Sequence, residues 1–233
     1  MSLEQTTVGT LVAEQPGRSR VLEKLGIDYC CGGKLPLEEA CRKRGLDPAA
    51  VVAQLREADE TGRPGEVDAA AMGLAELADH IEQAHHAWLR EELPRLDGMT
   101  KKVSAVHGES EPRLREVREA FCALREEMFS HMQKEEQILF PAIRALERGE
   151  PAPMGSVAGP IAQMEHEHEQ AGGALAAIRA ATDDFEPPAW ACGTYRAMLA
   201  GLADLEADMH RHIHKENNVL FPRAMRLEAQ EKH

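Results

Sequence analysis

Aromatic residues are scarce in this chain of 233 residues, where Phe, Trp and Tyr together make up 4% of the sequence. Hydrophobic residues still make up 43%, so a core must be built mainly from Leu, Ala, Val, Ile and Met. The chain also lacks the Val/Thr/Tyr alternation of β-strands and is rich in Ala, Leu, Glu and Arg, which favour helix. The composition therefore predicts an all-α protein.

Long apolar runs and an excess of basic residues are missing as well. No apolar stretch approaches the ~20 residues of a membrane span, and Met1–Glu14 lacks the basic start and apolar run of a signal peptide. The formal net charge of −13 argues against nucleic acid or an anionic membrane as a partner. We therefore expect a soluble, cytoplasmic protein that binds neither.

The five cysteines are an odd number, so a complete disulfide framework is not expected. In a reducing compartment we expect thiols. Cys41, Cys122 and Cys192 are interpreted as small packing residues. The adjacent Cys30 and Cys31 have two interpretations that spacing does not separate: a redox or transient metal-ligand pair, or small buried residues at a turn.

The chain divides into two kinds of helical pattern. Short patterns between residues 8 and 58 are interrupted by Gly and Pro, and a polar stretch from Glu60 to Glu66 is typical of a linker. Four longer patterns follow, and their short connections suit an up-and-down four-helix bundle. Their expected spans are 72–96, 112–148 with a local break near Pro141, 157–182 and 188–230. The expected domains are a small helical N-terminal domain (1–59), a linker (60–71) and the bundle (72–230).

The second half of the bundle sequence repeats the first. Residues His131 to Pro141 match His212 to Pro222, with His, Lys, Glu, Leu, Phe and Pro at the same relative positions, 81 residues apart. A histidine precedes each copy at a similar distance, His86 in the first case and His168 in the second. The pattern indicates a duplicated helical hairpin.

Polar residues interrupt the apolar stripes of these helices. In the second, third and fourth patterns, apolar residues recur in steps of three and four, which places them on one helix face. The same stripes contain His131, Glu135, His168, His212 and Glu216. Burying an imidazole or a carboxylate without a partner costs several kcal/mol, and bound cations are the compensating partner that suits several helices at once.

The stripes therefore predict a metal centre. His and Glu at i and i+4 lie about 5–6 Å apart on one face, close enough to share a metal. Mixed imidazole and carboxylate ligation suits iron, manganese or zinc, and the all-helical bundle favours two iron ions. In the first helix His85 and His86 continue two neighbouring apolar stripes, and periodicity leaves both open as the ligand. His214 falls outside the stripes and is expected in solvent.

Four motifs in this order resemble the RIC family of di-iron iron–sulfur cluster repair proteins, also called YtfE, ScdA or DnrN. They are Asp28-Tyr-Cys-Cys-Gly-Gly, His131-Met-x-Lys-Glu-Glu-Gln-Ile-Leu-Phe-Pro, Met164-Glu-x-Glu-His168 and His212-Ile-x-x-Glu-Asn-Asn-Val-Leu-Phe-Pro. The resemblance covers nearly the full chain. Its C-terminal part is similar to a hemerythrin-like bundle and its N-terminal part to the ScdA-type domain.

The resemblance implies a specific set of site residues. The ligands of two iron ions, bridged by oxo and carboxylate groups, would be His86, His131, Glu135, His168, His212 and Glu216. His86 is preferred over His85 because the family's first ligand precedes an Arg-Glu-x-Leu-Pro stretch, here Arg90–Pro94. His107 matches another family histidine near the site, and Cys30 and Cys31 match the paired cysteines implicated in the family's function.

The resemblance also implies the function. The expected role is repair of iron–sulfur proteins damaged by nitrosative or oxidative stress, by supplying iron to them. The alternatives are a protein that binds or reduces nitric oxide at a diferrous centre, in the second case an oxidoreductase, and a redox or nitric-oxide sensor. The chain has fewer histidine ligands than the oxygen-carrying hemerythrins, so oxygen carriage is not expected. A homodimer is compatible with the sequence.

Overall fold

The computed structural model describes residues 2–60 and 67–231, and every named element in these ranges is helical. The β pairing found among them is an isolated bridge between Thr7 and Pro36. The all-α prediction is therefore confirmed. Residues 61–66 of the expected linker lie outside the described residues. Of the helices in the described ranges, none combines the length and the hydropathy that crossing a membrane requires.

The chain forms two compact units that are not continuous in sequence. Unit 1 comprises Met1–Ala78, Ile143–Val157 and His210–His233, and unit 2 comprises Asp79–Ala142 and Ala158–Met209. The division falls within α5 (Leu74–Ile81), α8 (Phe140–Glu147) and α10 (Gly193–Lys215).

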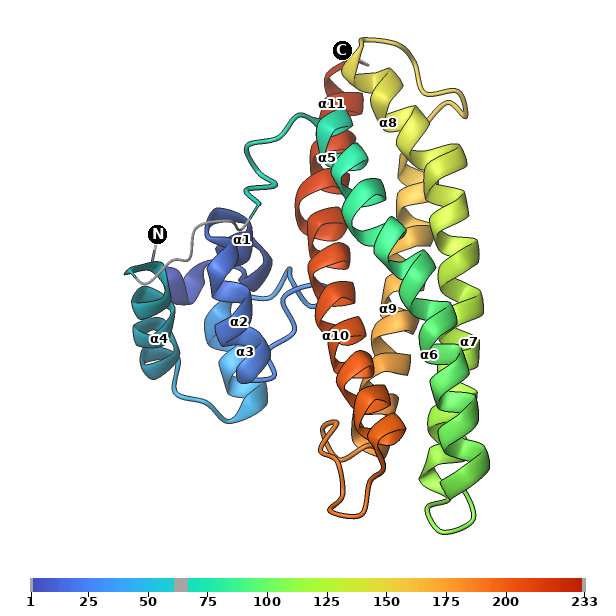
Figure 1. Ribbon diagram of the computed structural model, residues 1–233. Coiled ribbons are helices and arrows are strands. Elements are labelled where there is room, and N and C mark those ends of the chain that lie inside the picture. The colour runs from blue at the N-terminus through green and yellow to red at the C-terminus, as the bar shows by residue number, and fades with distance from the viewer. Residues whose placement is uncertain (1, 61–66, 232–233) are drawn as a thin grey trace. The chain divides into compact units, whose positions relative to one another are not determined.

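Unit 2 is built from η3 (Glu82–His86), α6 (Ala87–His107), α7 (Arg113–Lys134), η4 (Glu135–Leu139), α9 (Ala158–Ala181) and most of α10. Helix α7 packs on α6 and on α9. Arg179 of α9 donates to Glu206 of α10, and a Cβ added at Gly201 of α10 would lie 2.8 Å from Leu96 of α6. These four helices therefore run side by side, as Figure 1 shows, which confirms the four-helix bundle.

The first long helix continues further than its sequence pattern indicated. Helix α6 contains Pro94 and ends at His107, whereas the expected end was near residue 96. Tertiary contacts of this face explain the extension: Thr100 and Val103 are each 1% exposed, and Thr100 accepts a hydrogen bond from Arg118 of α7 at 2.9 Å. Tertiary packing of this face outweighs the low helix propensity of the Asp97-Gly98 step.

Three five-residue π-helical segments interrupt the long helices: η3, η4 and η5 (Glu216–Leu220). Pro141 and Pro222 follow η4 and η5 by two residues, and the chain continues as α8 and α11 (Phe221–Glu231). Proline lacks the N–H that an α-helix needs, so the expected break at Pro141 is realised as a π segment within a continuing helix. Such segments are rare and occur frequently at functional sites.

The N-terminal part of unit 1 consists of η1 (Leu3–Gln5), α1 (Val8–Glu14), η2 (Pro16–Arg18), α2 (Ser19–Lys24), α3 (Leu37–Arg44) and α4 (Pro48–Glu60). Its core is aliphatic, with Leu11, Leu22 and Leu55 fully buried. The buried Arg18 donates to both carboxylate oxygens of Asp59, at 2.8 and 2.7 Å, and ties α4 to η2. The loop between α2 and α3 carries Cys30 and Cys31.

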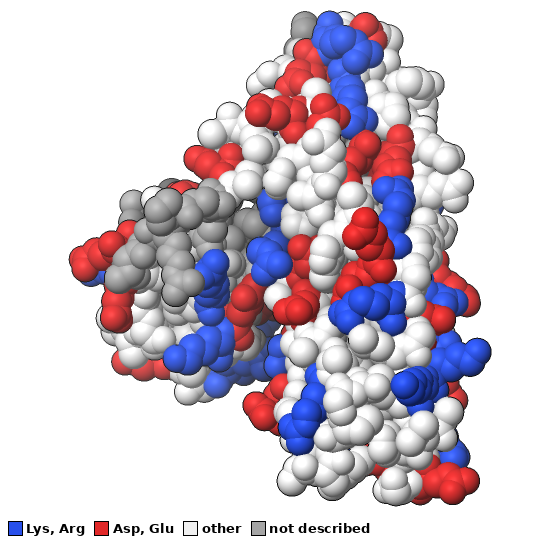
Figure 2. Space-filling model, in the orientation of Figure 1, with Lys and Arg blue, Asp and Glu red and all other residues white. Residues whose placement is uncertain are grey.

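The surface carries both signs of charge. Among the described residues on the face drawn in Figure 2, Lys and Arg side chains are interspersed with Asp and Glu rather than gathered in one basic patch. On this face the two signs of charge therefore lie close together, within a chain whose formal net charge is −13.

Candidate metal centre

The core of unit 2 contains four polar side chains that face one another. His86, His131, Glu135 and His168 are each at most 1% exposed. The Nε2 atoms of His86 and His131 both lie 3.3 Å from Oε2 of Glu135. The Nε2 atoms of His131 and His168 lie 3.0 Å apart. The structure thus brings together four of the six predicted ligands from three helices, with Glu135 between two imidazoles.

Two carboxylates outside the predicted ligand set orient these imidazoles. His86 Nδ1 lies 2.7 Å from Glu136, and His131 Nδ1 lies 2.9 Å from Glu167. Because Nδ1–H donates to a carboxylate, the Nε2 lone pair faces Glu135 in both cases, which is the arrangement of metal-ligating histidines. Sequence reasoning missed Glu136 and Glu167. Each is adjacent in sequence to a predicted ligand, but only tertiary contacts show its role.

The charges of these carboxylates are set by their partners. A hydrogen bond from His131 is the main cause that lowers the pKa of Glu167 to about 2. Burial opposes this shift, and hydrogen bonds from Lys134 and Gln163 add to it. Burial opposes ionisation of Glu136, but hydrogen bonds from Arg90 and His86 outweigh it and lower the pKa of this carboxyl. Both groups are therefore anionic at neutral pH and raise the basicity of the imidazoles that they contact.

His85 has a different partner from His86. Its Nδ1 lies 3.0 Å from both carboxylate oxygens of Asp208, and its side chain is buried. The structure brings His86, not His85, to Glu135. Of the two histidines that periodicity left open, His86 is therefore the one placed beside Glu135.

In unit 1, the second copy of the motif forms a similar pair. Nε2 of His212 lies 2.9 Å from Oε1 of Glu216, and neither side chain is exposed. Glu216 is the first residue of η5, as Glu135 is the first residue of η4. The two copies of the motif therefore have similar local geometry at the His-x3-Glu pair, with Nε2 3.3 Å from the carboxylate in the first copy and 2.9 Å in the second.

The donor set fits a divalent metal of intermediate softness. Imidazole and carboxylate donors suit iron, manganese and zinc. A carboxylate buried as completely as Glu135 is destabilised unless cations or hydrogen bonds offset its desolvation, and a metal bound by neutral imidazoles supplies that charge. The residues of the site therefore fit a bound metal cation.

A pocket of about 270 Å³ between α7 and α9 extends to His131. Its walls include Glu126, Glu127 and Glu167, and Lys134 forms an ion pair with Glu167 at one side. The side chains of Glu126 and Glu127 give this opening an acidic rim. Such a rim attracts cations from solution.

The paired cysteines lie in the α2–α3 loop of unit 1. Cys30 is 5% exposed and Cys31 is partly exposed, and their sulfur atoms are 3.8 Å apart. All five cysteines are thiols, as expected. Cys41 is fully buried, which confirms its packing role, but Cys192 is exposed and that prediction was wrong.

Two histidines do not lie where the sequence placed them. His107 ends α6, a helix of 21 residues whose rise puts it about 30 Å from His86. It contacts Cys192 at 3.5 Å and the rings of Trp190 and Tyr195. The expectation that it lies near the site was therefore wrong. His214 is buried rather than solvated, because Tyr29 of the α2–α3 loop covers it.

Comparison with known proteins agrees with this architecture. The model of the hemerythrin HHE cation binding domain matches residues 77–224. The ScdA_N model, described as a domain of unknown function (DUF542), matches residues 4–59.

Similar curated proteins span almost the whole chain. Iron–sulfur cluster repair protein YtfE of Enterobacter sp. is 43% identical over 97% of this chain and 99% of its own length. The YtfE protein of Musicola paradisiaca is 39% identical over 98% of this chain and 100% of its own length. The YtfE protein of Escherichia coli O157:H7 is 41% identical over 97% of this chain and 99% of its own length. From the buried His/Glu cluster, the two matching domain models and these full-length similarities, it follows that this chain belongs to the hemerythrin-domain family that includes the iron–sulfur cluster repair proteins YtfE.

Proposed function

We propose that the chain holds two iron ions and that six side chains bind them: His86, His131, Glu135, His168, His212 and Glu216. The observation that carries the proposal is the buried cluster around Glu135, whose imidazoles already direct Nε2 toward its carboxylate. The His212–Glu216 pair repeats this geometry in the second copy of the motif. Glu135 and Glu216 would be the carboxylates shared by both ions. The oxo bridge would belong to the oxidised, diferric form, and the iron that is supplied would leave from the reduced, ferrous form.

We further propose that the protein repairs damaged iron–sulfur clusters by supplying iron. The relatives that cover nearly the whole chain are named iron–sulfur cluster repair proteins. When bound, iron supplies the cargo of the reaction, and the chain's own residues determine how it is held. Glu136 and Glu167 fix the imidazoles through Nδ1 and keep their Nε2 lone pairs available for the metal. We propose that ferrous iron reaches and leaves the site through the acidic pocket, whose lining includes His131.

Release of iron follows from the chemistry of the ligands. Imidazole and carboxylate are harder donors than thiolate, and the cysteines of an iron–sulfur site bind iron as thiolates. Iron in a His/Glu site can therefore move to a vacant cysteine site without a change in its oxidation state. The division into an N-terminal domain (1–59), a linker (60–71) and a bundle (72–230), and the assignment of Cys30 and Cys31 as a redox or iron-transfer pair, remain part of this proposal.

A second candidate function uses the same centre on nitric oxide. The pocket that reaches His131 is large enough for a diatomic molecule. Two metal ions held close together could bind two molecules with their nitrogen atoms near each other. Production of nitrous oxide by the reduced, iron-loaded protein under anaerobic conditions would support reduction. Binding without turnover would support a sensor or scavenger.

The test of the repair function is iron transfer. Anaerobically loaded protein is mixed with an iron–sulfur enzyme inactivated by nitric oxide, and the recovery of enzyme activity is compared with recovery in the same concentration of free ferrous iron. We expect faster and more complete recovery with the loaded protein, and no such advantage with a Glu135→Ala/Glu216→Ala variant. Recovery no better than with free iron would overturn the proposed function.

A further inference from the structure

The α2–α3 loop gathers three potential metal ligands outside the His/Glu centre. Asp28, Cys30 and Cys31 each offer a ligand atom, and these atoms all lie within 4.8 Å of one another. The sulfur of Cys30 lies 3.2 Å from Oδ1 of Asp28 and 3.8 Å from the sulfur of Cys31. The loop thus holds two sulfurs and one carboxylate close to one another.

The carboxylate of Asp28 is held in place by the backbone of the same loop. Oδ1 accepts the N–H groups of Cys30 at 2.9 Å and Cys31 at 3.0 Å, and Oδ2 accepts that of Gly32 at 2.8 Å. Carboxylates that ligate metals are commonly fixed by hydrogen bonds of this kind. Asp28 therefore both shapes the loop and keeps its carboxylate beside the two sulfurs.

A residue of η5 fixes the loop from outside. The side-chain amide of Asn218 donates to the carbonyl of Cys30 at 3.0 Å and to that of Tyr29 at 3.3 Å. A Cβ added at either Gly9 or Gly33 would lie 2.2 Å from Oδ1 of Asn218, so both positions need glycine for this side chain to fit. The conformation that gathers the ligands is therefore held by contacts from α1, the loop and η5.

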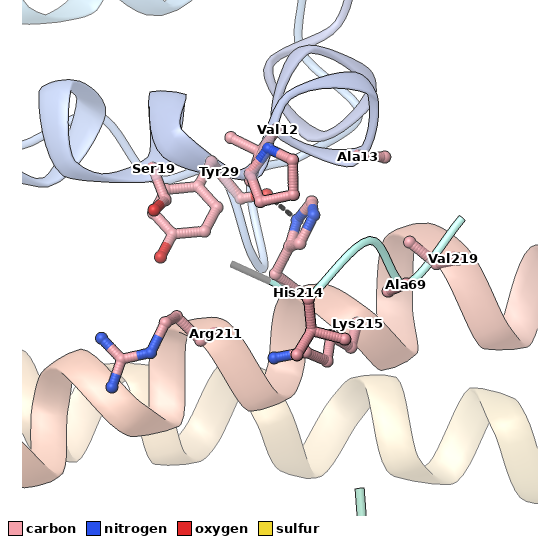
Figure 3. A pocket seen from close by; sticks show the side chains of 11 residues that line it. Val12, Ala13, Ser19, Tyr29, Ala69, Arg211, His214, Lys215 and Val219 are labelled. Atoms are coloured by element: carbon pink, nitrogen blue, oxygen red, sulfur yellow. Dashed lines mark hydrogen bonds between the residues drawn. The ribbon is translucent and has the colours of Figure 1, made fainter. Parts of the chain in front are cut away.

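Tyr29 anchors the same loop next to Asn218. Its carbonyl contacts Nδ1 of His214 at 3.4 Å, the interaction drawn as a dashed line in Figure 3, and its hydroxyl donates to Glu23 at 2.6 Å. The adjoining pocket measures about 80 Å³, well below the volume of typical small-molecule sites. Tyr29 therefore adds a second anchor for the loop that carries Asp28, Cys30 and Cys31.

The electrostatics of the loop favour a cation. A divalent cation would replace the thiol protons and neutralise the resulting thiolates and Asp28. Two sulfurs and one oxygen suit borderline-soft ions such as ferrous iron, zinc or cobalt(II), and three protein ligands leave a fourth position open for exchange.

We propose that Asp28, Cys30 and Cys31 form a second cation site, which binds ferrous iron transiently and is distinct from the His/Glu centre. Binding forms two metal–thiolate bonds and one metal–carboxylate bond, releases the two thiol protons to solvent and changes no oxidation state. The inference rests on the proposed function in one respect, because iron supply gives such a site its purpose. The existence of the site is independent of that function.

The test is a cobalt(II) titration of the full-length, metal-free protein with its thiols reduced. Thiolate ligands give cobalt(II) an intense charge-transfer absorption that imidazole and carboxylate ligands do not give. We expect this absorption in the natural protein and in the Glu135→Ala/Glu216→Ala variant. It should vanish in Cys30→Ser/Cys31→Ser, persist in the control Cys122→Ser, and require about tenfold more cobalt in Asn218→Ala, which loses two hydrogen bonds to the loop.

Two results would overturn the proposal: no thiolate absorption in the natural protein, or absorption that persists in Cys30→Ser/Cys31→Ser. Circular dichroism establishes that each variant is folded. If a serine variant fails to fold, Asp28→Asn provides the second measurement, and unchanged cobalt affinity in that variant would count against the site. Failure of iron transfer with an intact cobalt site would reject the proposed function alone.

Discussion

The two copies of the repeated motif, His131 to Pro141 and His212 to Pro222, agree on one face and differ on the other. On the inward face both have a buried His and Glu four residues apart, and in both the Glu begins a π segment. On the outward face, Ile138 is 50% exposed, whereas its counterpart Val219 is 3% exposed. Gln133 and Gln137 are exposed, but the equivalent His214 and Asn218 contact the α2–α3 loop.

The comparison shows which positions have the same role in both copies of the motif and which have different surroundings. The positions of the metal ligands are constrained in both copies by the same chemistry. The outward residues are constrained only where another part of the chain packs on them. Among the described residues, the α2–α3 loop packs on the outward face of the second copy. Each outward pair therefore provides a matched control within one molecule.

The largest expected effect concerns the inward face. Glu135→Ala and Glu216→Ala should each abolish stable binding of iron, because each removes a buried carboxylate that balances the charge of the metal. Metal content after anaerobic loading and gel filtration measures this, with circular dichroism as the control for folding. If either variant keeps two iron ions, the two copies are not equivalent as ligands.

Apolar burial on the outward face should be the next largest difference. Val219→Ala should lower the free energy of unfolding by about 2 kcal/mol, because it removes two buried methyl groups. Ile138→Ala should change it by about 0.5 kcal/mol or less, since that side chain is half exposed. Urea unfolding of the metal-free variants measures both values. Equal losses would show that Ile138 is also covered in solution.

The amide of Asn218 should control access to the cysteine pair. Asn218→Ala should raise the rate at which iodoacetamide alkylates Cys30 by about tenfold, because two hydrogen bonds to the loop are lost and the loop opens more often. Gln137→Ala, the matched change in the first copy, should leave the rate unchanged. Mass spectrometry of the alkylated peptides identifies the modified thiol. The same rate in all three proteins would mean that Asn218 does not hold the loop.

The smallest expected effect is a dependence of stability on pH. Burial, offset in part by the hydrogen bond to Tyr29, lowers the pKa of His214 to about 4. The unfolded chain therefore binds a proton near pH 6.5 that the folded chain takes up only near pH 4. The stability associated with His214 is complete above pH 6.5 and is lost as the pH falls toward 4.

The change His214→Gln, which introduces the residue of the first copy, should weaken this dependence. Urea unfolding of metal-free protein at pH 7.5 and pH 5.5 gives the comparison, and the use of metal-free protein removes any contribution from metal release. The natural protein should lose more stability between these values than His214→Gln does. Parallel losses would contradict a buried, neutral His214.

Much of the candidate site could be predicted from the sequence because helical periodicity determines which side chains share a face. His131, Glu135 and His168 interrupt apolar stripes, and burial follows from those stripes. The choice of His86 over His85 could not be made in this way, because the two residues continue neighbouring stripes. That choice depends on the π-helical segment η3, which contains both histidines, and on Asp208. Asp208 is distant in sequence, and its carboxylate contacts Nδ1 of His85.

Other errors have the same cause. His214 was expected in solvent because it lies outside the stripe of its own helix, and a local pattern does not contain the loop that covers it. His107 was expected near the site, but it is the last residue of α6, at the end of that helix opposite to His86. Glu136 and Glu167 were missed because a carboxylate next to a ligand in sequence has no periodic signature of its own.

The sequence by itself determined the helical class, the duplicated hairpin and the burial of His and Glu on shared stripes, because these properties depend on spacing along one helix. Only the tertiary structure decided which nitrogen of His86 and of His131 faces Glu135, which carboxylates orient these two rings and which outward face is covered. Those features depend on contacts between residues that are distant in sequence, and the geometry of such contacts is determined when the helices pack.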